Sequence, residues 1–404
     1  MVGKRKSYLV MAVVLLFSLS FGAAGCGSDK PAATTTQGTS GGQAKVVNVG
    51  WSGPLSGGAA IYGQDTVEGL KMAVEEINGK GGITVSGQKY TINLITLDDQ
   101  YMPNMTATNA RRLRSENKVP VIFTPHAGGV YALQEFNLEE KFLIVAHSAD
   151  PQIAERGNKL TFVAAPPFSG QPEPFSRVAM EKYGKKVALI PATHKYAKDW
   201  TTTFVSAWEK LGGQVTGNFA VDYNKETDFY TYVSKALATK PDVLFVGGPS
   251  KPTAMIIKQA RQLGFKGGFV LMDQARLEEM EKVVPLSDLT GCIGMMPLYQ
   301  MPGPGVGKFV ENYKARYGGK LPTFHHAGNY MAMKIVARGM EKAGTVEDAA
   351  KIFEGMKQIF PIKEEGFPYE LTGINSNGSL QVEEAGVMVT DGKYGPPVPI
   401  SVKK

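Results

Sequence analysis

The chain has 404 residues, enough for roughly two to three domains of ordinary size. Hydrophobic residues make up 43% and charged residues 20%, a balance that excludes a disordered chain and a polytopic membrane protein. Two Cys and five His exclude a disulfide scaffold and leave little material for a metal site, and a net charge of +7 is too small to indicate nucleic-acid binding.

The N-terminus predicts export. Basic residues at 4–6 precede an apolar stretch at 8–21, which is shorter than a membrane-spanning helix needs. Small residues then lead to Cys26, so 1–25 has the layout of a secretory signal peptide. A Cys directly after small residues resembles the lipobox of bacterial lipoproteins, in which that Cys is lipidated; the alternative is ordinary secretion with Cys26 incidental. The small polar residues at 26–44 predict a flexible tether.

Strands and helices alternate in the next part of the chain. Continuous apolar runs rich in β-branched residues predict buried strands, and apolar residues every three or four positions predict helices. The predicted strands are 46–51, 90–97, 119–123 and 142–146, and the predicted helices between them are 67–77, 104–115 and 131–140.

A second series of the same kind begins near Lys186. Its predicted strands are 187–190, 242–248 and 268–272, and its predicted helices are 200–211, 228–238 and 250–263. Ser250 is the predicted N-cap of the last of these helices. A helical block follows, with predicted helices at 308–317, 325–341 and 346–358.

This alternation predicts an α/β fold. Buried strands separated by helices form parallel sheets with helices on both faces, and two series predict two doubly wound lobes. The joint between them is the proline-rich segment 166–174. Ligands of such folds lie outside the carboxyl ends of the strands, so we expect a cleft between two facing lobes.

Three stretches resemble one known family. Residues 47–83, which include a Gly-Pro-Leu-Ser-Gly motif, are similar to the opening of the leucine/isoleucine/valine-binding proteins, the solute receptors of ABC importers. Residues 225–267 resemble the second-lobe core of that family, and 329–344 resemble its late helix. The resemblance implies the type I periplasmic binding fold with three crossovers, in which lobe one is 45–165 plus 298–384 and lobe two is 166–297 plus 385–404.

The resemblance also implies a function. The chain is expected to capture a small ligand, an amino acid of the branched-chain type or a related small carboxylate, and to deliver it to ABC permease subunits. We expect an exported monomer, held by its lipid anchor on the outer face of the cell membrane or in the periplasm. No enzymatic activity, cofactor, metal or nucleic-acid partner is implied. The alternative is a ligand-sensing subunit of a signalling system. An enzyme is disfavoured because neither a zinc-protease motif nor a P-loop occurs.

In this family the loops after the strands hold the charged ends of an amino acid. In lobe one, Ala127 and Gly128 match a helix start whose backbone N–H groups take the carboxylate, with a plain glycine turn as the alternative. His147 and Ser148 follow the strand at 142–146, and Ser148 is expected to contact the ligand directly. His147, which stands where the family has Gly, is a candidate ligand contact.

Further site residues follow from the same resemblance. Tyr62 matches a position that lines the side-chain pocket, with Trp51 as a weaker neighbour. In lobe two, Tyr196 matches a tyrosine that closes over the ligand. Asp273 matches the acid that pairs with the ligand ammonium, unless the register places Gln274 there instead.

One wall of the site departs from the family pattern. The loop at 247–250 lacks the aromatic residue that the family often carries there. We therefore expect this wall, at Gly248, to be more open than in the relatives.

Overall fold

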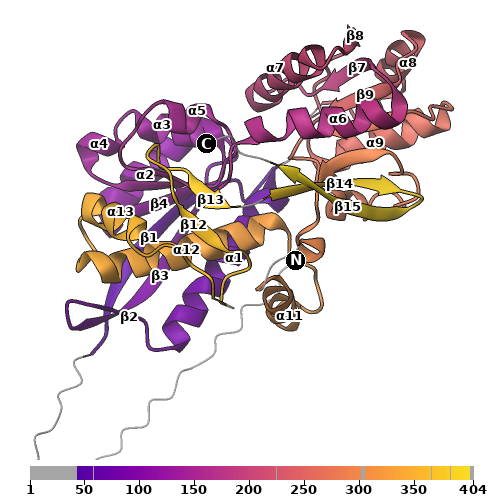
Figure 1. Cartoon of the computed structure of the whole chain (residues 1–404). Coiled ribbons are helices and arrows are strands. Elements are labelled where there is room, and N and C mark those ends of the chain that lie inside the picture. Colours follow the sequence, from indigo (N-terminus) through magenta and orange to yellow (C-terminus); the bar gives the residue numbers. More distant parts are fainter. Residues whose placement is uncertain are drawn as a thin grey trace, which may run out of the picture. The chain divides into compact units, whose positions relative to one another are not determined.

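The computed structural model describes residues 43–400, apart from positions 58, 224, 302–304, 365 and 383. The predicted signal peptide, Cys26 and almost all of the predicted tether lie outside the described residues. Within them, helices and strands alternate and the strands form two large sheets (Figure 1). None of the described helices is long and apolar enough to cross a bilayer.

The first sheet is parallel except at one edge, where β2 pairs antiparallel with β3. In sheet order its strands are β2 (Ile83–Val85), β3 (Gln88–Asp98), β1 (Lys45–Gly53), β4 (Val121–Thr124), β5 (Leu143–Ala146) and β6 (Thr161–Val163). β1 lies inside the sheet and pairs in parallel with both β3 and β4.

Helices cover both faces of the first sheet because successive strand residues point to opposite sides. In β5, Leu143 and Val145 pack with α1 (Ala60–Gly79), α12 (Phe324–Ala343) and α13 (Ala349–Lys357). Ile144 packs on the other face with α2 (Pro103–Asn117) and α3 (Ala127–Gln134). The late helix α12 lies alongside α1, so the helical block near the C-terminus belongs to the first sheet (Figure 1).

The second sheet has antiparallel strands, β14 and β15, at one edge. In sheet order its strands are β15 (Lys393–Ile400), β14 (Glu384–Thr390), β11 (Cys292–Met295), β10 (Gly268–Leu271), β9 (Val243–Gly247), β7 (Lys186–Pro191) and β8 (Gln214–Asn218). Its helices are α6 (Pro172–Tyr183), α7 (Lys195–Lys210), α8 (Tyr230–Ala238), α9 (Ser250–Gln262) and α10 (Leu277–Met280).

Both faces of the second sheet are also apolar. Phe245 of β9 stacks against both Trp200 and Phe204 of α7, with ring centroids 5.6 and 4.5 Å away. Leu244, the preceding residue, packs on the opposite face with Ile257 of α9. The same alternation that buries the first sheet on both sides therefore buries the second.

The remaining helices, turns and strands complete the described chain. They are α4 (Asn137–Glu140), α5 (Gln152–Glu155), α11 (Val306–Arg316), the 3₁₀ turns η1 (Phe168–Gly170) and η2 (Leu298–Gln300), and a separate hairpin of β12 (Leu371–Ile374) and β13 (Leu380–Val382).

Core membership shows where the chain passes from one sheet to the other. Ala164 packs in the core of the first sheet and Phe168 in that of the second. The chain returns between Met296 and Leu298, and it crosses again between β13 and Ala385.

The predicted α/β fold with parallel sheets is confirmed, and three details differ. The antiparallel edge strands were not predicted. The helix predicted at 131–140 begins earlier, at Ala127, and is broken into α3 and α4. The prediction that Ser250 caps its helix is wrong, since Ser250 is the first helical residue and its hydroxyl bonds elsewhere.

Candidate ligand-binding site

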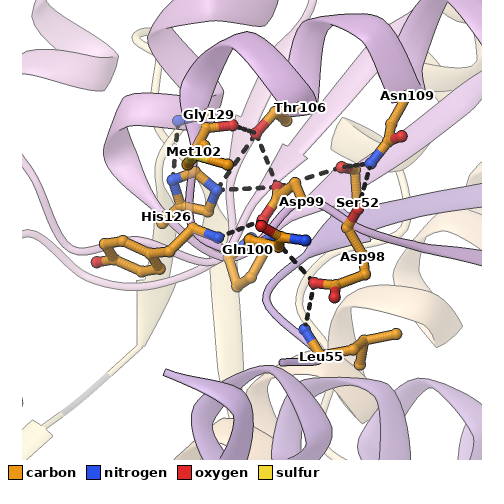
Figure 2. Close-up of polar contacts among 12 residues, drawn as sticks. Ser52, Leu55, Asp98, Asp99, Gln100, Met102, Thr106, Asn109, His126 and Gly129 are labelled. Carbon is orange, nitrogen blue, oxygen red and sulfur yellow. Dashed lines mark hydrogen bonds and ion pairs between the residues drawn. The ribbon is translucent and has the colours of Figure 1, made fainter. Parts of the chain in front are cut away.

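A buried hydrogen-bond network ties together the loops at the carboxyl ends of β1 and β3 (Figure 2). Asp99, which is fully buried, accepts hydrogen bonds at Oδ2 from the hydroxyls of Ser52 (3.2 Å) and Thr106 (2.7 Å). Asp98 accepts one at Oδ1 from the backbone N–H of Leu55 (2.8 Å). Because hydrogen bonds of a buried carboxylate are costly to break, this network fixes the loops relative to one another.

His126 connects the network to the start of α3. Its Nδ1 accepts the Gly129 N–H at 3.0 Å, so the ring proton is on Nε2, which donates to Asp99 Oδ2 at 3.0 Å (Figure 2). An imidazole therefore fills the N-cap role that Ser, Thr, Asp and Asn usually have. No group in the described part of the chain accepts a hydrogen bond from the N–H of Ala127 or Gly128. These two amides at the positive end of a helix suit an anion.

Tyr101 was not predicted from the sequence to lie at the site. Gln100 and Tyr101 both have positive φ (53° and 65°), a conformation that L-residues with side chains rarely adopt. This backbone conformation is stabilised because the Asp98 and Asp99 carboxylates accept hydrogen bonds from the backbone N–H groups of Gln100 and Tyr101, respectively, each at 2.9 Å. The turn places the Tyr101 ring on that of His126, with centroids 4.6 Å apart. Nothing in the sequence distinguishes a tyrosine that stacks on a distant histidine from any other tyrosine in a polar loop.

Tyr62 links the loops that follow β4 and β5. Its hydroxyl makes hydrogen bonds to the carbonyl oxygens of Pro125 and His147, the latter at 3.0 Å. Its ring meets His325 of α12 edge-on, at 4.7 Å between centroids. The structure therefore brings Tyr62 and His147, both predicted site residues, together with His325, which was not predicted to be a site residue.

His147 and His325 form a neutral imidazole pair. His147 Nε2 lies 3.0 Å from His325 Nδ1. Burial, followed by the charge of Arg276, lowers the pKa of His147 to about 3, and burial also lowers the pKa of His325. His147 is 3% exposed and its Nδ1 has no hydrogen-bond partner. Ser148, the next residue, is buried as well.

Residues of the second sheet approach the tyrosines of the first. Tyr196, at the start of α7, donates its hydroxyl to Asp273 Oδ2 at 2.6 Å, while Asp273 Oδ1 is buried without a partner. Burial raises the pKa of Asp273 to about 6. The charge of Asp273, after burial and Tyr101, contributes to the raised pKa of Tyr62. The Asp273 carboxylate therefore lies close enough to Tyr62 of the first lobe core to influence its ionisation.

Two expectations about the walls of the site are wrong. Gly248 does not leave an opening, because a Cβ added there would lie 2.0 Å from Tyr223 Cε2, so this ring already fills the space. The Tyr223 hydroxyl is held by the carbonyl oxygen of Ile190 at 2.6 Å. Trp51 is fully buried in the core of the first sheet and lines no surface.

Comparisons with known proteins agree with this architecture. The family model described as periplasmic binding protein matches residues 46–380. The leucine-, isoleucine-, valine-, threonine-, and alanine-binding protein of Pseudomonas aeruginosa is 23% identical over 316 residues, which cover 78% of this chain and 83% of that protein. The crystal structure of the leucine-binding protein LivK of Thermotoga maritima superposes with a TM-score of 0.75 at 25% identity, covering 87% of this chain and 98% of LivK. LivJ of Streptococcus pneumoniae, solved with isoleucine, gives a TM-score of 0.76 at 20% identity, covering 88% and 99%.

Proposed function

The chain belongs to the periplasmic binding protein family, a family of solute-binding proteins, and we propose that it binds an amino acid or a related small carboxylate for an ABC importer. The family resemblance seen in the sequence is thereby confirmed. The observation that carries the proposal is that the hydrogen-bonded pair of Asp273 and Tyr196, from the second sheet, lies near enough to Tyr62, from the first, for their charges to interact. The relatives named above support an amino-acid ligand.

The two charged ends of an amino acid have matching partners in this arrangement. The free N–H groups of Ala127 and Gly128 suit the carboxylate, and the Ser148 hydroxyl, in the loop after β5, is the further donor that we assign to it. Asp273 suits the ammonium, because its unpartnered Oδ1 needs a donor and an ionised carboxylate is costly to bury alone. Tyr196 holds that carboxylate in place through Oδ2.

The proposed mechanism is closure of two lobes without chemistry. Lobe one comprises 45–165 plus 298–384, and lobe two comprises 166–297 plus 385–404. Ligand binding supplies the missing hydrogen-bond partners and so favours the closed arrangement, a hinge motion about the three crossovers. Small-angle scattering is expected to give a smaller radius of gyration with ligand; an equal radius at saturating ligand contradicts closure.

The ligand class is tested by thermal unfolding with a panel of amino acids and small carboxylates. A ligand at 100 times its dissociation constant stabilises the bound state by about 2.7 kcal/mol, which such a screen detects. If no amino acid or carboxylate stabilises the chain at millimolar concentration, the proposed ligand class is wrong. Uptake of the binding ligand by cells with and without this chain separates import from sensing.

The proposal includes export and lipid anchoring at Cys26. The basic, apolar and small-residue segments before that cysteine support it. Cys26→Ala is expected to move the chain from the membrane fraction to the soluble fraction, because the lipid has no other attachment point in the leader. Retention of the variant in the membrane fraction would show that the anchor is assigned wrongly.

A further inference from the structure

Exposed lysines gather along one edge of the first sheet. The amino ends of parallel strands lie at the same edge of a sheet, and the register places Lys45 beside Tyr90 and Val121 beside Leu143. Five exposed lysines lie at the starts of these strands or just before them: Lys45 in β1, Lys89 in β3, Lys118 before β4, Lys141 before β5 and Lys159 before β6. None of them has an ion-pair partner among the described residues. We call these five lysines the basic edge.

The acidic residues beside the basic edge do not neutralise it. Glu116, at the end of α2, pairs with Arg112 at 3.0 Å, and Glu140 of α4 lies 3.7 Å from Arg111. These carboxylates are therefore shared with arginines of α2. Glu139 of α4 is exposed as well, but a single carboxylate does not balance five lysines. The edge keeps a positive charge.

Helix ends explain only part of this pattern. Basic residues are favourable at helix C-termini because they complement the helix dipole. Lys118 and Lys141 are indeed the C-caps of α2 and α4, but both have positive φ (53° and 54°), a conformation that favours Gly or Asn. Lys45 and Lys89 begin strands, so no helix dipole accounts for them.

Apolar side chains are exposed among these lysines. Val46 of β1 is 60% exposed and Leu138 of α4 is 50% exposed. The helix α4 is held at this edge because Asn137 Nδ2 donates to the carbonyl oxygens of Phe142 (3.2 Å) and Leu160 (3.0 Å). Lysines with apolar neighbours suit a membrane surface, where the charges meet lipid phosphates and the apolar groups enter the headgroup region.

The lipid anchor reaches the described chain at this same edge. Residues 27–44 join Cys26 to Lys45, and a chain of this length spans at most about 65 Å when extended. As the flexible coil that its composition predicts, it has a mean span of about 25 Å. A short tether of this kind makes the second contact with the membrane intramolecular, at an effective concentration in the millimolar range. Weak contacts of a few lysines are then sufficient.

We propose that the basic edge docks on anionic phospholipid headgroups of the membrane that holds the Cys26 anchor. This inference rests on the lipid anchoring in the proposed function and is independent of the ligand class. The tether selects the first lobe, because Lys45 is the point at which the anchored segment enters the fold.

Docking in this way leaves the candidate ligand site uncovered. β1 runs nine residues from Lys45 to Gly53, which is about 30 Å of strand. Ser52, near its far end, belongs to the hydrogen-bond network that positions the site loops. Lobe one is thus held at the membrane by the end opposite the site, and lobe two remains free to close.

The test measures the distance of the basic edge from the membrane by energy transfer. The lipidated full chain is placed in vesicles of phosphatidylcholine alone or of an equal mixture with phosphatidylglycerol, each containing a headgroup-labelled acceptor lipid. The donor dye is attached through Ser115→Cys, at the exposed end of α2, or through Ser287→Cys, exposed just before β11. Cys292 is buried and does not compete for the dye.

We expect higher energy transfer from position 115 in the phosphatidylglycerol vesicles than in phosphatidylcholine alone, and no such increase from position 287. The increase should disappear in about 1 M salt, where the Debye length falls to about 3 Å. Each lysine near an anionic surface contributes about fivefold to the docking equilibrium. Removal of all five charges is therefore expected to abolish the increase.

Two variants with the same change in net charge make the result specific. The edge variant combines Lys45→Gln, Lys89→Gln, Lys118→Asn, Lys141→Asn and Lys159→Gln, with Asn at the two left-handed positions. The control variant makes five matched changes at exposed lysines near the amino ends of the second sheet, where no tether arrives: Lys185→Gln, Lys186→Gln, Lys210→Gln, Lys240→Asn and Lys266→Gln. Only the edge variant is expected to lose the increase. Thermal unfolding checks that both are folded.

Three results would overturn the inference. The first is equal transfer from position 115 in the two kinds of vesicle, and the second is an equal loss in the edge and control variants, which would indicate a general effect of net charge. The third is a purified chain without lipid, since the tether is then absent; the anchoring at Cys26 fails with it, whereas binding of amino acids is measured without vesicles and is unaffected.

Discussion

Asp273→Asn tests whether the ligand-free chain buries this carboxylate as the structure shows. The substitution keeps the shape of the side chain and removes its charge. The Tyr196 hydroxyl, 2.6 Å from Asp273 Oδ2, can donate to the carboxamide oxygen as well, so the contact between the two residues is retained. The change therefore isolates the cost of holding a charge at this position.

The magnitude follows from the pKa of Asp273, which burial raises from 3.8 to about 6. At a pH above both values this difference corresponds to up to about 3 kcal/mol of lost stability. Because the pKa is raised in the folded state, the penalty is absent below about pH 4, grows as the pH rises toward 6, and is constant above that. The Asn variant is thus expected to be more stable than the parent at pH 7.5 and equally stable near pH 4.

Urea unfolding of the ligand-free parent and variant at both pH values measures this difference. Asp391→Asn is the matched control, because Asp391 is exposed and has a left-handed backbone conformation that Asn tolerates. This variant should have the stability of the parent at both pH values. Binding is expected to change in the opposite direction, because an amino-acid ligand loses a charged partner for its ammonium and should bind about tenfold more weakly. Equal stability of parent and variant at pH 7.5 would refute the reasoning, since it would mean that Asp273 is hydrated in the free protein.

Two other predictions concern the framework of the site. His126→Ala removes the N-cap of α3 and the donor to Asp99, and is expected to destabilise the chain by about 1–2 kcal/mol in thermal unfolding. His126→Asn keeps a capping acceptor and should lose less; equal losses would mean that capping is not the role of His126. Gly248→Ala places a Cβ against the Tyr223 ring and is expected to cost about 1–3 kcal/mol by overpacking. The same substitution in a Tyr223→Leu background should cost much less, and additive losses in the double variant would argue against that contact.

The sequence by itself determined the regular structure and the family. The helical face of Trp200, Phe204 and Trp208 and the continuous apolar strand at 243–247 are local patterns, and burial of both faces of a sheet requires them. The opening motif within 47–83 was also sufficient to indicate the family, because it is contiguous in the chain. Each of these features is readable within a short window, so no knowledge of distant contacts is needed.

Only the tertiary structure decided how the site is built. Tyr101, Tyr223 and His325 come from loops or helix ends without periodicity, and each is defined by a partner far along the chain. Arg276 reads in the sequence as an ordinary charged residue, but packing buries it beside Glu278, which accepts a hydrogen bond from its Nε. Hydrogen-bond satisfaction and desolvation depend on which segments meet in space, and those two quantities, rather than local patterning, determine what this site can bind.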